Sequence, residues 1–292
     1  MTTLRSSSLA HGVAISLLAV ASHVSAQPTP SPPSAATATP PGGGPCAGVW
    51  FPAGARVQME SDGAMPMSRT GIQSPPTESA RSCHTTVQIH SKSALAALMG
   101  PPIITEQDDQ ITITPPSPTS PARIEGHAVV NARGPYARLY GTTTSLGEGV
   151  FNYADQDLRE GVTLASEYVE SSLSFTLYAR DSGEEIGTFY APHATLSVSG
   201  RHVGRRQTIE TAMGRKECVP ITYERRTWTG PLQILDETLN TDPHIMQVTD
   251  WYCPSEGFVL RTDVVENGKT QRIDTTEITP LHGAKEVLSA PE

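Results

Sequence analysis

The stretch FVLRTDVVENGKTQRIDTTEIT, residues 258–279, contains the complete pattern of a β-hairpin. Its centre, Asn267-Gly268, is the strongest two-residue signal for a type I′ turn. That turn places Glu266 directly opposite Lys269 and sets the pairing of every residue further along both strands. The sequence therefore predicts an antiparallel hairpin with a defined register at this end of the chain.

Charge patterning in the same stretch agrees with that register. Counting outward from the turn pairs Asp263 with Arg272 and Arg261 with Asp274, so opposite charges face each other on one wet side. The residues that alternate with them form the packed side, and these are Phe258, Leu260, Thr262, Val264 and Ile273. One face is charged and one is mostly apolar, as expected for a sheet that covers a core.

Similar short strands, separated by turn residues, recur through most of the chain. We expect a mainly β protein whose curved antiparallel sheet forms a half-barrel, a barrel or a sandwich. One short helix is predicted at 93–99, because Gly100 and the prolines at 101–102 would end it. Other strands are expected at 55–59, 85–90, 110–114, 123–132, 136–143, 161–170, 173–180, 185–190, 195–199, 203–212, 218–228, 232–239 and 245–253.

The first 45 residues indicate export. Arg5 precedes the apolar run 12–21, and Val24-Ser25-Ala26 is a small-residue cleavage signal, which together are typical of a secretory signal peptide at 1–26. Residues 27–45, rich in Pro, Ala and Gly, lack large apolar side chains and are expected to form a disordered tether. We expect an N-terminal β segment with the short helix at 46–114 and the main antiparallel β domain at 122–285, separated by the proline-rich segment 115–121. The periplasm is the first expectation for localisation, and the extracellular medium is the alternative.

The chain is acidic, with a formal net charge of −9. Removal of the signal peptide takes away Arg5 and no acid, which leaves −10. An acidic chain without a basic run is poorly suited to bind nucleic acid or anionic lipid headgroups. After signal cleavage, no remaining apolar run reaches the length of about 20 residues that a membrane-spanning helix needs.

All four cysteines, Cys46, Cys83, Cys218 and Cys253, lie beyond the signal peptide. In an oxidising compartment an even number of cysteines predicts disulfides, and four cysteines allow three connectivities. We favour Cys46–Cys83 and Cys218–Cys253, because each pair encloses a compact stretch. A metal site is disfavoured, because the closely spaced Cys or His pairs that bind zinc are missing from the sequence.

The segment 217–281 resembles part of a known group of proteins. The stretch Glu217–Tyr223, the turn and strand Trp251–Arg261 (WYCPSEGFVLR) and the final strand Thr276–Thr279 resemble the closing strands of uncharacterised proteobacterial exported envelope proteins. Some of these are related in shape to LolA-like half-barrels, which have an apolar concave face. The resemblance implies a binding or chaperone-like shell rather than an enzyme, and Cys253, at a position more often polar in such turns, supports a local disulfide to Cys218. A concave apolar sheet would accept acyl chains or an apolar peptide.

Motifs for catalysis, cofactor binding or metal binding are absent from the sequence, including the G-x-S-x-G elbow, S-x-x-K, H-E-x-x-H and the Walker loop. Catalytic, cofactor-binding and metal residues are therefore not assigned, and no cofactor is expected. Trp228, Trp251 and Tyr252 are candidates for lining a ligand groove, although packing in the core is the more common role of such aromatics.

Together these features predict an exported, soluble, non-catalytic β protein that binds a lipid-like apolar ligand or a protein of the envelope. Two alternatives remain open. One is a structural or interaction module of the cell envelope, and the other is a hydrolase whose site is assembled from residues distant in sequence.

Overall fold

A computed structural model describes residues 54–281, except 62–66, 76, 79–81, 94–98, 100–102, 152 and 154–155. The described part of the chain is all-β and contains no helix. Its strands are β1 (Ala55–Ser61), β2 (Met67–Gln73), β3 (Thr77–Glu78), β4 (Cys83–Ser93), β5 (Ile103–Thr114), β6 (Ala122–Arg133), β7 (Ala137–Gly149), β8 (Thr163–Leu164), β9 (Glu167–Ala179), β10 (Glu185–Val198), β11 (Arg201–Val203), β12 (Gln207–Thr211), β13 (Gly214–Trp228), β14 (Leu232–Ile234), β15 (Glu237–Leu239), β16 (His244–Cys253), β17 (Phe258–Glu266) and β18 (Lys269–Pro280).

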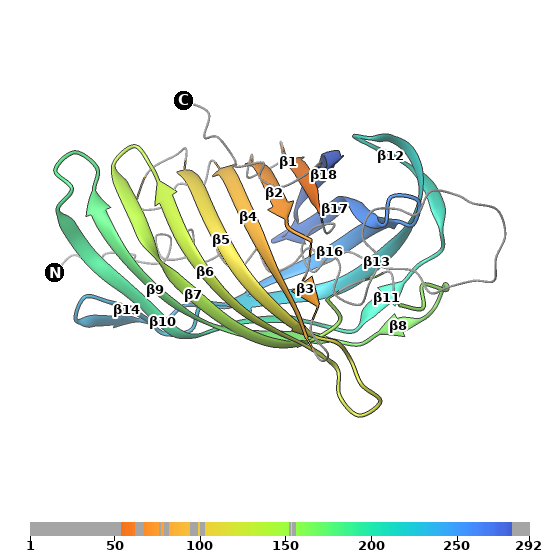
Figure 1. Ribbon diagram of the computed structural model, residues 1–292, viewed down its shortest axis with the longest axis horizontal. Coiled ribbons are helices and arrows are strands. Elements are labelled where there is room, and N and C mark those ends of the chain that lie inside the picture. The colour runs from red at the N-terminus through yellow and green to blue at the C-terminus, as the bar shows by residue number, and fades with distance from the viewer. Residues whose placement is uncertain are drawn as a thin grey trace.

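Twelve of these strands close into an antiparallel barrel. Successive pairings run β1–β2–β4–β5–β6–β7–β9–β10–β13–β16–β17–β18, and β18 returns to pair with β1. Figure 1 shows β4, β5, β6, β7 and β9 side by side as one long curved wall, with β13, β16 and β17 behind it. The strands on either side of the proline-rich segment 115–121 belong to this one ring, because β5 pairs with β6 along its whole length.

The final hairpin, β17–β18, has the predicted register. Glu266 faces Lys269, Asp263 faces Arg272 and Arg261 faces Asp274. Ion pairs run along each strand of the hairpin: Arg261 contacts Asp263 at 2.9 Å and Arg272 contacts Asp274 at 2.6 Å. An extended arginine spans the distance to the second residue along its own strand, so this contact competes with the cross-strand contact expected from the register.

The turn of this hairpin gives a testable prediction. Asn267 and Gly268 both have positive φ, 50° and 74°, as a type I′ turn requires. We expect Gly268→Ala to lower the free energy of unfolding by about 1 kcal/mol, because a Cβ disfavours this left-handed conformation. Urea denaturation measures the change. Asn267→Gly, which keeps a residue that accepts a positive φ at the other turn position, should change stability little and is the control.

Alternation along the strands fills the barrel with side chains. On β5, for example, Ile111 and Ile113 are buried while Gln110 faces solvent. The largest buried cluster joins residues from nearly all sides of the ring, among them Val57, Val87, Ile124, Leu196 and Leu260. Each large aliphatic side chain buried in this way stabilises the fold by roughly 1.5–3 kcal/mol. The space between the walls is therefore a packed core.

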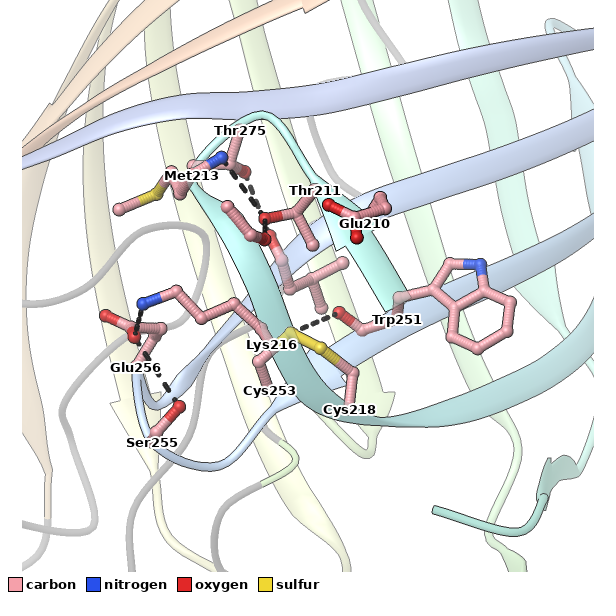
Figure 2. The surroundings of a disulfide bond; sticks show 12 residues. Glu210, Thr211, Met213, Lys216, Cys218, Trp251, Cys253, Ser255, Glu256 and Thr275 are labelled. Atoms are coloured by element: carbon pink, nitrogen blue, oxygen red, sulfur yellow. Dashed lines mark hydrogen bonds and ion pairs between the residues drawn. A yellow bond between two sulfur atoms is a disulfide. The ribbon is translucent and has the colours of Figure 1, made fainter. Parts of the chain in front are cut away.

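A disulfide fastens one end of the barrel. Cys218 on β13 and Cys253 on β16 are bonded across these neighbouring strands, next to the facing pair Val219 and Tyr252. Figure 2 shows the bond beneath the β12–β13 hairpin, with the ion pair between Lys216 and Glu256 beside it. This half of the favoured connectivity is confirmed. Cys83 is also disulfide-bonded, and its predicted partner Cys46 lies outside the described residues.

Several predicted segments also lie outside the described residues. These are the signal peptide 1–26, the tether 27–45 and most of the helix predicted at 93–99, of which Ser93 is the last residue of β4. Within the part of the chain that the structure describes, no helix has the length and apolarity needed to cross a membrane.

Candidate functional site

The three aromatic residues predicted to line a groove lie in three different environments. Trp251 is half-buried and donates from Nε1 to Asp263 at 2.8 Å, with the guanidinium of Arg261 5.7 Å from its ring centre. It therefore belongs to the charged outer face of the last hairpin. Tyr252, the next residue, is buried and packs against the ring of Tyr153.

Trp228 lies at the far end of β13 from the disulfide. Its Nε1 donates to the backbone carbonyl of Thr241 at 2.8 Å, and its side chain is half-buried. Because Trp251 and Tyr252 alternate on one strand, they face opposite sides of the sheet. The structure thus does not bring the three residues together on one surface.

A polar cluster inside the barrel was not anticipated from the sequence. The carboxylate of Asp250 on β16 accepts three hydrogen bonds, from the hydroxyls of Tyr153 at 2.7 Å, Tyr223 at 2.8 Å and Thr262 at 2.9 Å. All four side chains are buried. Burial raises the pKa of Asp250, and these hydroxyl donors oppose that rise by stabilising the carboxylate.

A buried ion pair lies beside Asp250. Arg201 on β11 contacts Glu167 on β9, and its guanidinium lies 5.8 Å and 5.4 Å from the ring centres of Tyr153 and Tyr223. Burial raises the pKa of Glu167, and the charge of Arg201 opposes that rise. The same burial raises the pKa of both tyrosines well above the usual value, so they remain neutral donors. This network connects five strands, β9, β11, β13, β16 and β17, and the loop that carries Tyr153. Such cross-linking suits a structural role better than proton transfer.

A third carboxyl, half-buried, lies in a different part of the sheet. Gln107 donates from Nε2 to both oxygens of Asp109, at 2.9 and 3.0 Å. The residues facing Asp109 on the two neighbouring strands, Val87 and Ala128, carry no charge. The pKa of Asp109 is raised to about 7: burial raises it, the hydrogen bond from Gln107 opposes the rise, and the charge of Asp108 adds to it.

This carboxyl predicts a pH dependence of stability. Between about pH 4 and pH 7 the folded protein retains a proton on Asp109 that the unfolded chain has released, so stability should fall as pH rises. The loss is at most about 1.4 kcal/mol per pH unit. Urea unfolding at pH 5 and pH 7 should show this slope, and Asp109→Asn, which keeps an oxygen for Gln107, should flatten it. An equal slope in both proteins would contradict the assignment.

The described residues contain no group of three or more His, Cys, Asp or Glu side chains placed to hold a metal ion. His193 pairs with Glu170 at 2.7 Å on the exposed surface, and His84 contacts the hydroxyl of Thr112 at 2.9 Å. In the loop before β8, Asp157 forms an ion pair with Arg159.

The outer surface carries a concentration of exposed aromatic and aliphatic side chains. Five of the nine large hydrophobic residues exposed in the described structure lie near the end of the barrel formed by β7, β9, β10 and the β14–β15 hairpin. We call these five the tyrosine patch, and they are Tyr136, Tyr140, Ile186, Tyr190 and Leu235. Tyr136 and Leu235 are 73% and 66% exposed.

Register places Tyr140 and Tyr190 on one outer face of the sheet. Tyr140 on β7 faces Thr176 on β9, and Thr176 in turn faces Thr188 on β10. Tyr190 is two residues further along β10, so it projects from the same side of the sheet. Polar residues therefore separate the aromatic rings and leave each ring accessible.

Leu235 lies at the edge of β10 with a strained backbone, and on the other side of the sheet from Tyr190, because it covers Gly187, which faces the buried Leu177. It is one of two non-glycine residues with positive φ in the described structure, at 54°, and its amide donates to the carbonyl of Thr188. Its side chain lies over Gly187, where a Cβ would come within 2.8 Å of it. A leucine in this conformation costs about 1–2 kcal/mol, and such strain is often found at functional positions.

Comparisons with known proteins give distant structural similarity only. No family model matches the chain, and no curated protein matches it. A crystal structure of a protein predicted to be exported, with a YmcC-like fold, from Bacteroides fragilis NCTC 9343 is 12% identical, with a TM-score of 0.43, over 78% of this chain and 96% of its own. A protein predicted to be a lipoprotein, from Parabacteroides distasonis ATCC 8503, is 10% identical, with a TM-score of 0.35, over 78% and 95%. The proposals below do not rest on either structure.

Proposed function

We propose that this chain is an exported, non-catalytic binding protein that docks a protein partner of the cell envelope on its tyrosine patch. The observation that carries the proposal is the clustering of exposed Tyr, Ile and Leu side chains on one end of β7, β9 and β10. Tyrosine is enriched among the residues that dominate the binding energy of protein interfaces, so several exposed tyrosines close together favour an interaction site. Export is inferred from the signal peptide pattern at 1–26.

The chemistry of the patch favours a protein over a lipid. Thr176 and Thr188 lie between the tyrosines of β7 and β10, and Arg138 lies two residues from Tyr140 on β7. Each ring therefore has polar groups beside it. Such a surface offers both apolar contact and hydrogen bonds, as protein interfaces do. An acyl chain would be better accommodated by a continuous apolar groove.

The packed interior argues against the hypothesis that a lipid-like ligand binds on the concave face of the sheet. The ring is closed, and its buried cluster extends from β1 to β17 across the space that an open half-barrel would leave free. A surface hollow of about 300 Å³ beside β3, β4 and β5 is lined mostly by polar residues, together with Pro75 and Ile111. The polar residues include Ser74, Thr77, His84, Thr86 and Gln110. Neither region offers a dry site for an acyl chain.

Site-specific photo-crosslinking in the native host tests this proposal. A photoreactive phenylalanine analogue at Tyr140 or Tyr190 should give a discrete crosslinked protein band. The same analogue at Tyr168, which is 46% exposed on β9 but lies away from the patch, should give none and is the matched control. Crosslinking at all three positions alike, or at Tyr168 alone, would rule out the patch as the docking surface.

Substitution of the exposed tyrosines should weaken binding of the protein partner. With the crosslinked partner purified, Tyr140→Ser together with Tyr190→Ser should weaken binding at least about tenfold, because truncating a hot-spot aromatic costs more than 1 kcal/mol. Tyr168→Ser should leave the affinity unchanged. All three substitutions are at exposed positions, so the thermal stability of each variant should match that of the unmodified protein.

A further inference from the structure

An exposed arginine lies between two members of the tyrosine patch. Arg138 and Tyr140 are two residues apart on β7, so both side chains project from the outer face of the sheet, and Tyr136 immediately precedes the strand. All three side chains are exposed. We call these three residues the tyrosine–arginine row. Tyrosine and arginine, together with tryptophan, are the residue types enriched among those that dominate the binding energy of protein interfaces.

The neighbouring strands bring more positive charge to this row. Arg133, the last residue of β6, directly faces Arg138. Arg180, which follows the last residue of β9, donates its backbone amide to the carbonyl of Tyr136 at 3.1 Å and therefore lies beside it. Like charges that face each other on neighbouring strands destabilise a sheet. Three arginines are thus gathered around the row, although the chain as a whole has a net charge of −9.

Among the described residues, only one of these three arginines is paired with a carboxylate. Arg133 contacts Glu106 at 2.6 Å. The guanidinium of Arg180 contacts the backbone carbonyl of Gly134 at 3.4 Å. The guanidinium of Arg138 forms neither an ion pair nor a hydrogen bond with the described part of the chain. A positive charge therefore lies without a counter-charge between the two exposed tyrosine rings.

The acidic side chains at this end of the sheet belong to a different place. Asp181, Glu184 and Glu185 lie in or just after the turn between β9 and β10. Glu185 faces Tyr178, and Tyr178 faces Arg138 on its other side, so β9 separates this carboxylate from the row. Residues 1–53, 94–98 and 100–102, which lie outside the described part, contain no Asp or Glu. These segments cannot supply a carboxylate to Arg138.

We propose that the protein partner docks an acidic segment on the tyrosine–arginine row, with one of its carboxylates bound to the guanidinium of Arg138. The inference rests on the docking proposed above and adds the chemistry of the partner. The planar guanidinium binds a carboxylate through two parallel charge-assisted hydrogen bonds. Tyr136 and Tyr140 would contact the apolar side chains of the same segment. Because the rest of the chain is acidic, an acidic partner is steered to this face and away from others.

The first test identifies the part of the partner that contacts the row. The full chain is expressed in its native host with a photoreactive phenylalanine analogue at Tyr140, and the crosslinked peptide of the partner is sequenced by mass spectrometry. We expect Asp or Glu among the residues that adjoin the crosslinked position. A crosslinked segment without acidic residues would contradict the proposal.

Charge reversal at Arg138 is the second test. Arg138→Glu should lower the yield of the Tyr140 crosslink, and the affinity for the purified partner, by about tenfold or more, because repulsion replaces attraction. Arg226→Glu, at an exposed arginine of β13 that faces Ser197 and Ile245, should leave both unchanged and is the matched control. Arg138→Glu places opposite charges across from each other at Arg133, so its melting temperature should not fall. Loss of binding could then not be attributed to unfolding.

The outcomes separate the charge of the partner from the docking itself. Equal crosslink yields in Arg138→Glu and the unmodified chain would overturn the acidic partner and leave docking on the tyrosine patch in place. No crosslink at Tyr140 or Tyr190 in the unmodified chain would overturn both. The affinity for the purified partner should also fall as the salt concentration rises, and this dependence should be weaker in Arg138→Gln.

Discussion

Replacement of Asp250 by alanine is expected to lower the free energy of unfolding by about 3–5 kcal/mol. Its carboxylate is the common acceptor for the hydroxyls of Tyr153, Tyr223 and Thr262. Without it, three buried donors lose their partner at once, and each unsatisfied group costs about 1–3 kcal/mol. The costs will not add fully, because the hydroxyls can turn toward one another. Urea denaturation followed by tryptophan fluorescence measures the change.

Two variants make the Asp250 result specific. Asp250→Asn retains one oxygen acceptor and should lose less stability than Asp250→Ala. Asp242→Ala removes an exposed carboxylate and should change stability by no more than about 0.5 kcal/mol. If Asp250→Ala proved as mild as Asp242→Ala, the interior cluster would not be a stabilising part of the fold.

The double substitution Cys218→Ala and Cys253→Ala should cost about 3–4 kcal/mol. The bond closes a loop between residues 35 apart in sequence, and the chain-entropy model places such a loop in this range. Alanine is preferred to serine, because both positions are fully buried and a hydroxyl would add a cost of its own.

Substitution is also a cleaner test of this bond than a reducing agent. Cys83 is disulfide-bonded as well, so a reductant would break more than the Cys218–Cys253 bond. The variant should unfold at lower urea concentration in oxidising buffer. A loss below about 1 kcal/mol would mean that the disulfide restrains the unfolded chain little. Pairing between β13 and β16 would then be sufficient to hold this end of the folded barrel together.

The part of the fold that depends on local signals could be predicted from sequence. The Asn267-Gly268 turn determines its hairpin without help from distant residues, and the structure has the expected register there. Residues 185–190 and 195–199, expected as two strands, belong to the single strand β10. Pro192 lies where the register of β10 with β9 shifts, between Ala191 and Ala194.

The interior cluster could not be predicted in the same way. A charged residue in an alternating strand is normally assigned to the face exposed to solvent. Strand β2 could not be predicted on this basis, because Arg69 and Gly71 occupy inward positions. Asp250 did carry a signal, since it shares its parity with Met246, Val248 and Tyr252, which are all buried. Only closure of the ring shows that this face points inward. The tyrosine patch likewise depends on the pairing of β7, β9 and β10, which the sequence alone does not define.

Native mass spectrometry of the mature protein, released gently from its own envelope, distinguishes docking on the tyrosine patch from ligand binding inside the sheet. We expect a protein complex that retains no acyl-chain ligand and that is lost when Tyr140 and Tyr190 are both replaced by serine. A chain that carries a lipid-sized adduct and no protein partner would contradict it, because binding would then take place inside the sheet rather than on the tyrosine patch.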